Sequence, residues 1–257
     1  MNNNSENNID PEKRFSSRVD DYIKYRPGYP EEIISFLKTE IEFNERWTVA
    51  DIGSGTGILS ELFLKNGNRV YCIEPNEEMR TAGESLLNKY QGFASLHGKA
   101  ELIPLKSKSI DLVTAGQAFH WFDVQKSKKE FNRILRSDGW AALIWNERLT
   151  DTDKFAEEYE KLLLDYSIDY AKVDHRNVDK KILSDFYSSY KLKIFPNEQV
   201  FDFDGLKGRL LSSSYVPKES HPNYLPMVIR LNEIFNDLHS EGKVKMKYKT
   251  QLYYGKL

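Results

Sequence analysis

The sequence predicts an α/β fold in which helices cover both faces of a doubly wound, mostly parallel sheet of seven strands. Short apolar runs alternate with segments in which apolar residues recur at helical spacing, a pattern typical of parallel strands buried on both faces. A glycine-rich turn follows the first apolar run, and the chain ends in a strand that begins with alternating apolar and lysine residues. The five expected central strands are Trp47–Ile52, Arg69–Ile73, Phe93–His97, Ile110–Ala115 and Trp140–Trp145.

The segment before the sheet is expected to hold a disordered tail and a helical cover. Residues 1–12 are polar and rich in asparagine, as disordered termini often are. Residues 13–44 are expected to form the cover, with one helix near Phe15–Tyr25 and a second that opens at Pro30. Two prolines and a glycine between residues 26 and 30 separate these helices.

Residues 45–146 are expected to form the core of the sheet, and residues 147–240 a mostly helical insertion that serves as a lid over the binding site. Apolar residues at helical spacing mark the connecting helices of the core, as in Leu59, Leu62 and Phe63. Residues 241–257 are expected to complete the sheet. Within the insertion we expect helices at Asp153–Tyr170, Lys180–Tyr190 and Pro222–Ser240. A strand or hairpin is expected at Lys191–Phe203 and would supply the sixth strand.

Composition excludes several classes of protein. The chain has 257 residues, of which 37 are basic and 39 acidic, so its net charge of −2 gives no footprint for nucleic acid. No apolar run reaches the roughly 20 residues that span a bilayer, and the polar N-terminus does not resemble a signal peptide. A single cysteine, Cys72, allows neither an internal disulfide nor a cysteine-based metal site. We therefore expect a cytoplasmic protein without a metal, either a monomer or a homodimer.

The strongest motif is the segment Val49-Ala50-Asp51-Ile52-Gly53-Ser54-Gly55-Thr56-Gly57, in which a strand enters a glycine-rich turn and then a helix. Glycines let the chain reverse tightly and let a ligand lie against bare backbone. The N–H groups at the helix N-terminus favour an anionic group such as a phosphate or carboxylate. Glu74, at the end of the second expected strand, is placed to accept both hydroxyls of a ribose.

Two kinds of cofactor could bind at such a turn: a nicotinamide dinucleotide, or a cofactor with a cationic or amino group. Nicotinamide dinucleotides favour Gly-x-Gly-x-x-Gly, whereas here the spacing is Gly-x-Gly-x-Gly and Asp51 precedes it. A buried acid at that position favours a cationic or amino-bearing ligand and repels a pyrophosphate. A turn that merely connects strand to helix is the third interpretation.

The segment Asp51–Gly57 resembles motif I of the class I S-adenosylmethionine-dependent methyltransferases. Further segments resemble later motifs of that family in the same order: Glu74-Pro75-Asn76, Gly98–Pro104, Ser109–Val113 and Phe131–Trp140. Tyr22–Pro30 and Gln117–Phe122 resemble the small-molecule type that includes the trans-aconitate methyltransferase-like proteins.

The resemblance implies S-adenosylmethionine as cofactor and a role for each matching residue. Backbone at Gly53, Ser54 and Gly55 would line the methionine part, with Asp51 near its amino group. The remaining roles concern the other parts of the cofactor. Glu74 would hold the ribose, Asn76 and Met79 would flank the adenine, and Ala100 and Glu101 would meet its edge. Gln117 would lie beside the methionine part or the methyl group. Tyr25 and Arg26 would close the site, with Arg26 pairing with the cofactor carboxylate.

The acceptor is expected to be a small molecule that offers a carboxylate or hydroxyl oxygen. Aromatic faces stabilise a sulfonium, which gives Phe119, Trp121 and Tyr22 a reason to lie near it. His120 is the candidate base, or else a wall of the pocket. A carboxylate acceptor needs no base, and a cation such as Arg26 or Arg209 would orient it.

The sequence therefore supports the hypothesis of an S-adenosylmethionine-dependent methyltransferase that acts on a small molecule. Two alternatives stay open: a non-catalytic protein that binds the cofactor, and a nicotinamide-dependent oxidoreductase, which the glycine spacing disfavours. A methyltransferase acting on RNA is disfavoured by the near-neutral charge.

Overall fold

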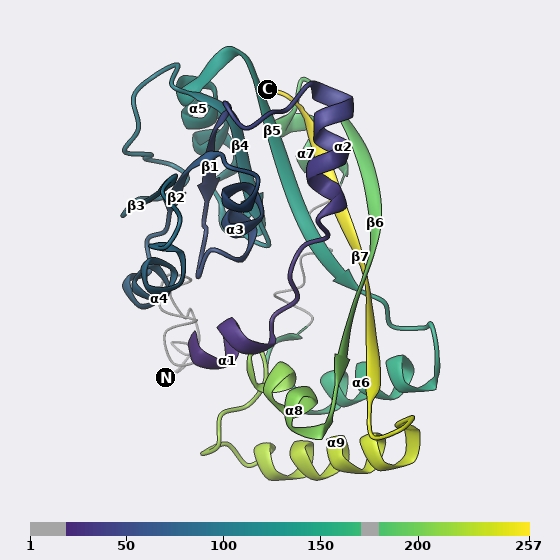
Figure 1. Ribbon diagram of the computed structural model, residues 1–257. Coiled ribbons are helices and arrows are strands. Elements are labelled where there is room, and N and C mark those ends of the chain that lie inside the picture. The colour runs from purple at the N-terminus through teal and green to yellow at the C-terminus, as the bar shows by residue number, and fades with distance from the viewer. Residues whose placement is uncertain (1–18, 171–179) are drawn as a thin grey trace, which may run out of the picture.

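The computed structural model describes residues 19–170 and 180–257 (Figure 1). The expected tail at residues 1–12 and the start of the helix near Phe15–Tyr25 lie outside the described residues. The centre of the fold is a seven-stranded sheet with the order β3-β2-β1-β4-β5-β7-β6. Its strands are β1 (Thr48–Ile52), β2 (Arg69–Ile73), β3 (Phe93–Leu96), β4 (Ile110–Gly116), β5 (Leu135–Arg148), β6 (Ser189–Phe201) and β7 (Val244–Lys256).

The sheet is parallel from β3 to β5 and antiparallel beyond it. β1 pairs with β2 on one side and with β4 on the other, so the direction of strand order reverses between β1 and β4. β7 runs antiparallel to both β5 and β6. In an open sheet of this kind, the carboxyl ends of the strands at such a reversal leave a crevice for ligands.

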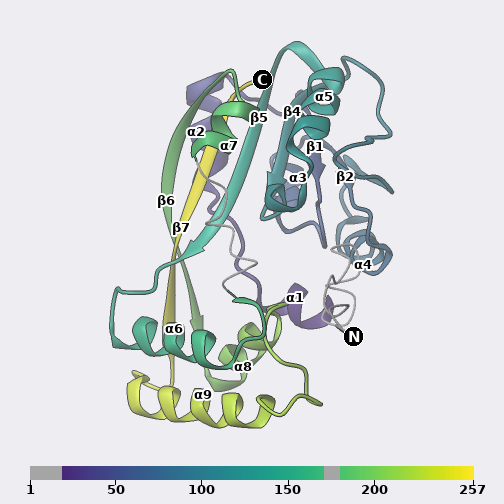
Figure 2. The ribbon, with the colours of Figure 1, turned by 180° about the vertical axis from the view of Figure 1, so that it is seen from behind.

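Helices cover both faces of the sheet, as Figures 1 and 2 show from opposite sides. Alternate residues along each strand point to opposite faces, so Val49 and Ala50 enter different cores. On one face Val49 packs with α2 (Glu32–Ile41) and α3 (Ile58–Lys65). On the other, Ala50 belongs to the core that includes α5 (Val124–Ile134) and α7 (Lys180–Phe186). α4 (Glu77–Leu87) contacts β3 near the edge of the sheet.

A third core lies away from the sheet centre, around the ends of β6 and β7 that extend beyond it (Figure 1). It is formed by α6 (Lys154–Tyr166), α8 (Phe203–Leu211) and α9 (Tyr224–Leu238) together with apolar residues of the two strands. We call this part the α6–α9 lobe. The short helix α1 (Val19–Tyr25) contacts α8, so the lobe lies beside the N-terminal segment.

The predicted fold class is confirmed, with differences at several element boundaries. The expected strand Trp140–Trp145 is the middle of a longer β5, because Leu135 pairs with Ile110 and residues 141–148 pair with β7. No helix was expected directly after the sixth strand, yet α8 begins at Phe203, where Asp202 caps it by accepting a hydrogen bond from the Gly205 N–H. In the described ranges no helix has the length and apolar content that a bilayer span requires.

Candidate functional site

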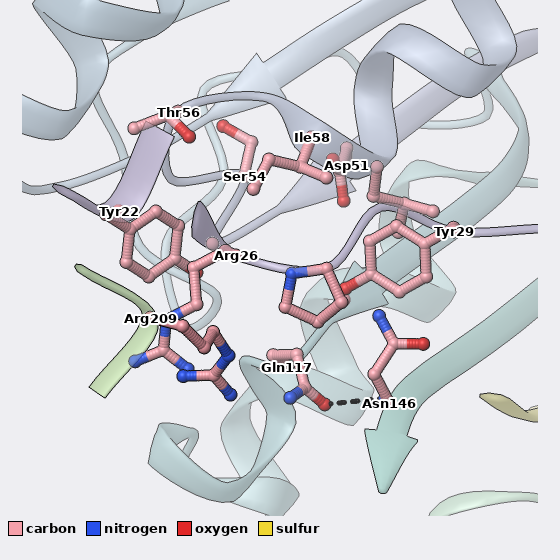
Figure 3. Close-up of a pocket in the computed structure, with 14 residues that line it drawn as sticks. Tyr22, Arg26, Tyr29, Asp51, Ser54, Thr56, Ile58, Gln117, Asn146 and Arg209 are labelled. Carbon is pink, nitrogen blue, oxygen red and sulfur yellow. Dashed lines mark hydrogen bonds between the residues drawn. The ribbon is translucent and has the colours of Figure 1, made fainter. Parts of the chain in front are cut away.

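Two adjoining pockets lie at the carboxyl ends of β1, β2 and β4, at the reversal of strand order. The larger, of about 340 Å³, is lined from the turn after β1, from Glu74 after β2 and from Gln117 after β4. The smaller, of about 40 Å³, is shown in Figure 3. Both pockets include Tyr22, Gly53, Gly116 and Gln117, so they share one wall and meet there. We call them the large and the small pocket.

The turn after β1 adopts a backbone that requires glycine. Gly53 and Gly55 have φ values of +67° and +56°, which L side chains rarely adopt. A Cβ atom on Gly53 would lie 2.7 Å from the Cβ of Ala118, so the bare backbone of the turn packs against a side chain of the loop after β4.

The N–H groups of this turn are already hydrogen-bonded within the protein. The N–H groups of Gly53 and Ser54 donate to the carbonyl of Ile73, at 2.8 and 3.2 Å, and that of Gly57 donates to the carbonyl of Ser54. The expectation that turn amides hold an anion therefore does not hold for these three groups. A ligand carboxylate in the small pocket needs a different donor.

Glu74 links the first and second strands at the floor of the large pocket. Its Oε2 accepts the N–H of Gly55 at 2.9 Å, and its Oε1 accepts the N–H of Asn76 at 2.8 Å. The residue is 8% exposed. Each carboxylate oxygen can accept more than one hydrogen bond, so these two bonds do not by themselves use up the acceptor positions of the group.

The other residues predicted for the adenosine part line the same large pocket. Asn76 caps α4 by accepting the N–H of Met79 at 2.8 Å, which fixes both residues beside Glu74. Ala100 and Glu101 line the pocket from the segment after β3. The Oε1 of Glu101 accepts the N–H of Asp123, so this side chain also ties that segment to the start of α5.

Asp51 is buried at the end of β1 and lines the small pocket. Its Oδ2 accepts from the hydroxyl of Ser60 at 2.6 Å and its Oδ1 from that of Thr114 at 3.1 Å, while the Cys72 thiol donates to Ser60. Burial raises the pKa of Asp51 to about 7, against the lowering effect of these two hydroxyls, and Glu74 adds to the increase. The carboxylate is therefore suited to a cationic partner.

Gln117 belongs to both pockets and has a positive φ of 54°, uncommon for a residue with a side chain. Its N–H donates to Ile144, and its Oε1 accepts the N–H of Asn146 at 3.1 Å, a bond drawn in Figure 3. These bonds from β5 hold the side chain at the junction. Strained backbone that neighbouring structure enforces is typical of functional sites.

Arg26 and Arg209 lie side by side at one end of the small pocket (Figure 3). Arg26 donates to the carbonyl of Ser212 at 2.8 Å, and its guanidinium lies 5.0 Å from the centre of the Tyr22 ring. Burial, and then the charge of Arg209, lower the pKa of Arg26. The sequence indicated each of them as a candidate to orient a carboxylate acceptor, but it did not place the two side by side.

Three expected residues lie outside both pockets. The ring of Tyr25 packs against Gly208 of α8, where an added Cβ would come within 2.0 Å of it. Phe119 is 1% exposed and packs in the core with Phe186, so it does not form part of a pocket wall. His120 is in the short 3₁₀ turn Phe119–Trp121, with its ring 4.8 Å from that of Trp121, which does line the large pocket.

Several pocket residues were not predicted. Tyr29 and Asn146 line the small pocket, and Lys99 and Phe122 line the large one. Asn146 ends the apolar run of β5, just as other pocket residues follow the apolar runs of β1, β2 and β4. Its place in the sequence could therefore have predicted it as a pocket residue. Across residues 19–170 and 180–257, no three His, Cys, Asp or Glu side chains gather in a way that could hold a metal ion.

Comparison with known proteins assigns the core of this fold. Residues 50–143 match the methyltransferase domain family. An uncharacterised methyltransferase from Schizosaccharomyces pombe is 34% identical over 137 residues, which is 53% of this chain and 53% of that protein. One from Mycobacterium tuberculosis is 36% identical over 134 residues, 52% of each chain. A methyltransferase-like protein of S. pombe is 25% identical over 245 residues, 94% of each.

These matches place a methyltransferase domain at residues 50–143 and support the resemblance to the class I S-adenosylmethionine-dependent methyltransferases. The matched segment spans about half the length of the first and second of these relatives. Solved structures share the methyltransferase fold: a candidate type II methyltransferase from Anaeromyxobacter dehalogenans has a TM-score of 0.64 at 18% identity, covering 90% of this chain and 98% of that one. A candidate methyltransferase from an antibiotic biosynthesis pathway of Anabaena variabilis has a TM-score of 0.61 at 19% identity, with 91% and 99% covered.

Proposed function

We propose that this methyltransferase binds S-adenosylmethionine across the two pockets and transfers its methyl group to a small molecule, at a carboxylate or hydroxyl oxygen. The observation that carries the proposal is the position of Glu74. It lies at the end of β2, holds the glycine turn through Gly55 and faces a pocket of about 340 Å³. An acid at this point of a doubly wound sheet suits the two hydroxyls of a ribose.

The large pocket fits the adenosine part of the cofactor. Glu74 would accept the ribose hydroxyls, Asn76 and Met79 would flank the adenine, and Ala100 and Glu101 would meet its edge. All five line one cavity, although they come from segments after β2 and after β3. The hydrogen bonds of Glu74 and Asn76 to nearby N–H groups hold these side chains in place before a ligand arrives.

The small pocket fits the charged end of the methionine part. Asp51 would take the ammonium group, and Arg26 the carboxylate, because the N–H groups of Gly53 and Ser54 are committed to Ile73. Arg26 uses one of its five N–H donors on Ser212, which leaves others for a ligand. Backbone at Gly53, Ser54 and Gly55 would lie against this part, and Gln117 would lie at the junction.

Methyl transfer requires mainly that the acceptor oxygen be aligned with the methyl carbon and the sulfur. When bound, S-adenosylmethionine supplies a methyl group on a sulfonium, whose carbon–sulfur bond breaks with its electron pair retained by sulfur as S-adenosylhomocysteine forms. Trp121 and Tyr22 line the pockets and offer aromatic faces to a cation. The protein's contribution is to hold the acceptor oxygen in line and exclude competing water.

His120 fits the role of a positioning residue better than that of a base. Its ring lies 4.8 Å from that of Trp121, and it is outside the lining of both pockets. A carboxylate oxygen is ionised at neutral pH and needs no base. His120→Gln should therefore lower turnover without moving its pH profile, whereas loss of one limb of that profile would identify a base.

The α6–α9 lobe supplies the acceptor side in this proposal, since Arg209 of α8 reaches the small pocket. We also propose the division of the chain into an N-terminal cover, a sheet core, a lid and a terminal strand. A cytoplasmic location is proposed on the cysteine count, with the one cysteine buried in β2.

Calorimetric titration with S-adenosylmethionine, S-adenosylhomocysteine and NADH tests the proposal directly. We expect micromolar binding of the first two and none of NADH. Binding of NADH alone would overturn the assignment. Turnover with organic acids, phenols and amines then separates an enzyme from a protein that only binds the cofactor.

A further inference from the structure

The strands on either side of β1 bring a thiol and a hydroxyl beside Asp51. In the register of the sheet, Asp51 lies opposite Cys72 of β2 on one side and opposite Thr114 of β4 on the other. Residues in register share a face of the sheet, and here it is the face that α3 covers, since Cys72 packs in one core with Leu59. Ser60 of α3 completes the group, and all four polar side chains are buried.

The hydroxyl of Ser60 does not make the hydrogen bond that serine commonly makes inside a helix, which is to a carbonyl of the preceding turn. Ser85 of α4 makes that bond, donating to the carbonyl of Thr81 at 3.0 Å. Ser60, the third residue of α3, donates instead to Oδ2 of Asp51 at 2.6 Å. A hydroxyl has a single proton to donate, so the proton of Ser60 is committed to the carboxylate.

The thiol of Cys72 fixes the direction of this bond. Its Sγ donates to the oxygen of Ser60 at 3.0 Å. Burial raises the pKa of Cys72 to about 12, and the charge of Asp51 adds to the increase, so the thiol keeps its proton at neutral pH. The two hydrogen bonds therefore run from the thiol to the carboxylate, and the last acceptor is strongest when Asp51 is ionised.

The surroundings of Asp51 otherwise do little to favour its charge. Other titratable side chains that face it or share its pocket are Glu74, Tyr22, Tyr29, Arg26 and Arg209. The glutamate opposes ionisation through its own charge, and burial keeps both phenols neutral by raising their pKa values. Within residues 19–170 and 180–257, neither arginine forms an ion pair with Asp51. The hydroxyls of Ser60 and Thr114 are the groups that offset the cost of burying this charge.

We propose that Ser60, oriented by the Cys72 thiol, is a positioning residue that keeps Asp51 ionised for the ammonium group of the cofactor. This inference rests on the proposed function, in which Asp51 takes that group. Ser60 lies outside the lining of both pockets, so it acts on the cofactor through Asp51. Without its hydroxyl, the buried carboxylate would retain the longer bond from Thr114, at 3.1 Å, and would keep its proton to a higher pH.

The first measurement needs no ligand. NMR of the whole chain with isotope-labelled aspartate follows the carboxyl carbon of Asp51, assigned with Asp51→Asn, as pH is varied. In Ser60→Ala the pH of its ionisation should rise by about one unit or more, because a hydrogen bond to a charged group is lost. Ser60→Thr keeps the hydroxyl and should remain close to wild type. Ser85→Ala, the matched control, removes a helix hydroxyl that bonds elsewhere and should change nothing.

The second measurement is the affinity for S-adenosylhomocysteine at several pH values, expressed as the ratio of wild type to variant so that ionisation of the ligand cancels. Near pH 6, Ser60→Ala should bind about tenfold less tightly than wild type. Near pH 9, where Asp51 is ionised in both proteins, the ratio should return to within about threefold. A purely structural role would lower affinity by the same factor at every pH.

Cys72→Ala tests the thiol. It should raise the pH of Asp51 ionisation by a few tenths of a unit, less than Ser60→Ala does, because the Ser60 bond to Asp51 remains. In a Ser60→Ala background the same change should have no further effect, since the thiol acts through the hydroxyl. Melting temperatures identify a variant that fails to fold. Ser60→Cys, whose thiol is a weaker donor, then replaces Ser60→Ala and should show a smaller rise.

Several outcomes would overturn the inference. An Asp51 ionisation that stays in place in Ser60→Ala would do so, as would a loss of affinity that is equal at every pH. An ionisation that moves without any change in affinity would mean that Asp51 does not hold the ammonium group. An unmoved ionisation in Cys72→Ala would remove the role given to the thiol. Failure of S-adenosylhomocysteine to bind the wild type would instead contradict the proposed function, and the NMR titration would still decide whether Ser60 controls Asp51.

Discussion

The carboxylate of Glu74 accepts a hydrogen bond from the N–H of Gly55 at 2.9 Å, so the acid that ends β2 is fastened to the glycine turn that ends β1. The two residues are 19 positions apart in sequence and come from neighbouring parallel strands. This bond makes the turn and the proposed ribose site one unit. A change at either residue is therefore expected to affect both.

Replacement of Glu74 by alanine should weaken binding of S-adenosylhomocysteine by about 1–3 kcal/mol, because it removes the proposed acceptor of two hydroxyls. Glu78→Ala, at an exposed position in the first turn of α4, is the matched control and should change affinity little. Calorimetric titration of both variants checks this. Unchanged affinity in Glu74→Ala would remove this residue from the cofactor site.

Asp51 should make cofactor binding depend on pH. Its pKa is raised to about 7, and an ammonium group favours the ionised form. Affinity for S-adenosylhomocysteine should therefore fall by about tenfold per pH unit below 7 and change little just above it. In Asp51→Asn this slope should be absent, and a slope that persisted would have to come from another group.

The carboxyl of Asp51 should also make the free energy of unfolding depend on pH, and this dependence has the opposite sign to that of cofactor binding. Between its unfolded value near 3.8 and about 7, the folded protein holds the proton more tightly than the unfolded chain, so its contribution to stability falls as pH rises. The free energy of unfolding of wild type relative to Asp51→Asn should drop by about 3–4 kcal/mol across that window. Urea titrations at several pH values measure it, and a difference that rose with pH would contradict the burial of this group.

Replacement of Gly53 by alanine should destabilise the protein by about 2 kcal/mol or more. Its φ of +67° disfavours a side chain, and the new Cβ would press on Ala118. Gly28→Ala is the control, because no atom lies within 4 Å of the Cβ that it would add. Urea unfolding of the pair checks the effect, and equal stability would show that the turn relaxes easily.

The ion pair of Arg148 with Glu160 should contribute far more to the free energy of unfolding than an ion pair on the exposed surface. Their side chains are 10% and 17% exposed, and the Tyr170 hydroxyl also donates to Glu160. Glu160→Gln leaves a buried charge without its partner and should cost about 3–5 kcal/mol. Asp185→Asn, in the exposed pair with Lys181, should cost about 1 kcal/mol or less by urea unfolding, and similar losses in both would refute the difference.

Prediction from sequence worked best where one local pattern carries the information. The apolar runs of β1, β2 and β4 are bounded by polar or glycine residues, so their positions were predicted within one residue. β5 is longer than predicted, because its last residues are extended through pairing with β7, about a hundred positions later. Pairing at that separation leaves no local pattern.

The residues that the sequence placed in the site also fall into two groups, those whose position a local pattern predicts and those whose position depends on distant packing. The residues after β1, β2 and β4 line the pockets, because carboxyl ends of parallel strands meet at one edge. Phe119 and Trp121 are two positions apart, yet the first packs in the core and the second faces the large pocket. Local sequence does not set which side of a single 3₁₀ turn faces the core, because the packing partners, such as Phe186, come from a distant helix.

The sequence by itself determined the order of strands and helices, the glycine turn and the acid that follows the second strand, since each depends on residues close together in the chain. Only the tertiary structure decided that Arg26 and Arg209, 183 positions apart in the sequence, share one small pocket. That meeting depends on how α8 packs against α1 and the ends of β6 and β7. Burial of apolar surface drives this packing, and it is non-directional, so no local pattern records which side chains it brings together.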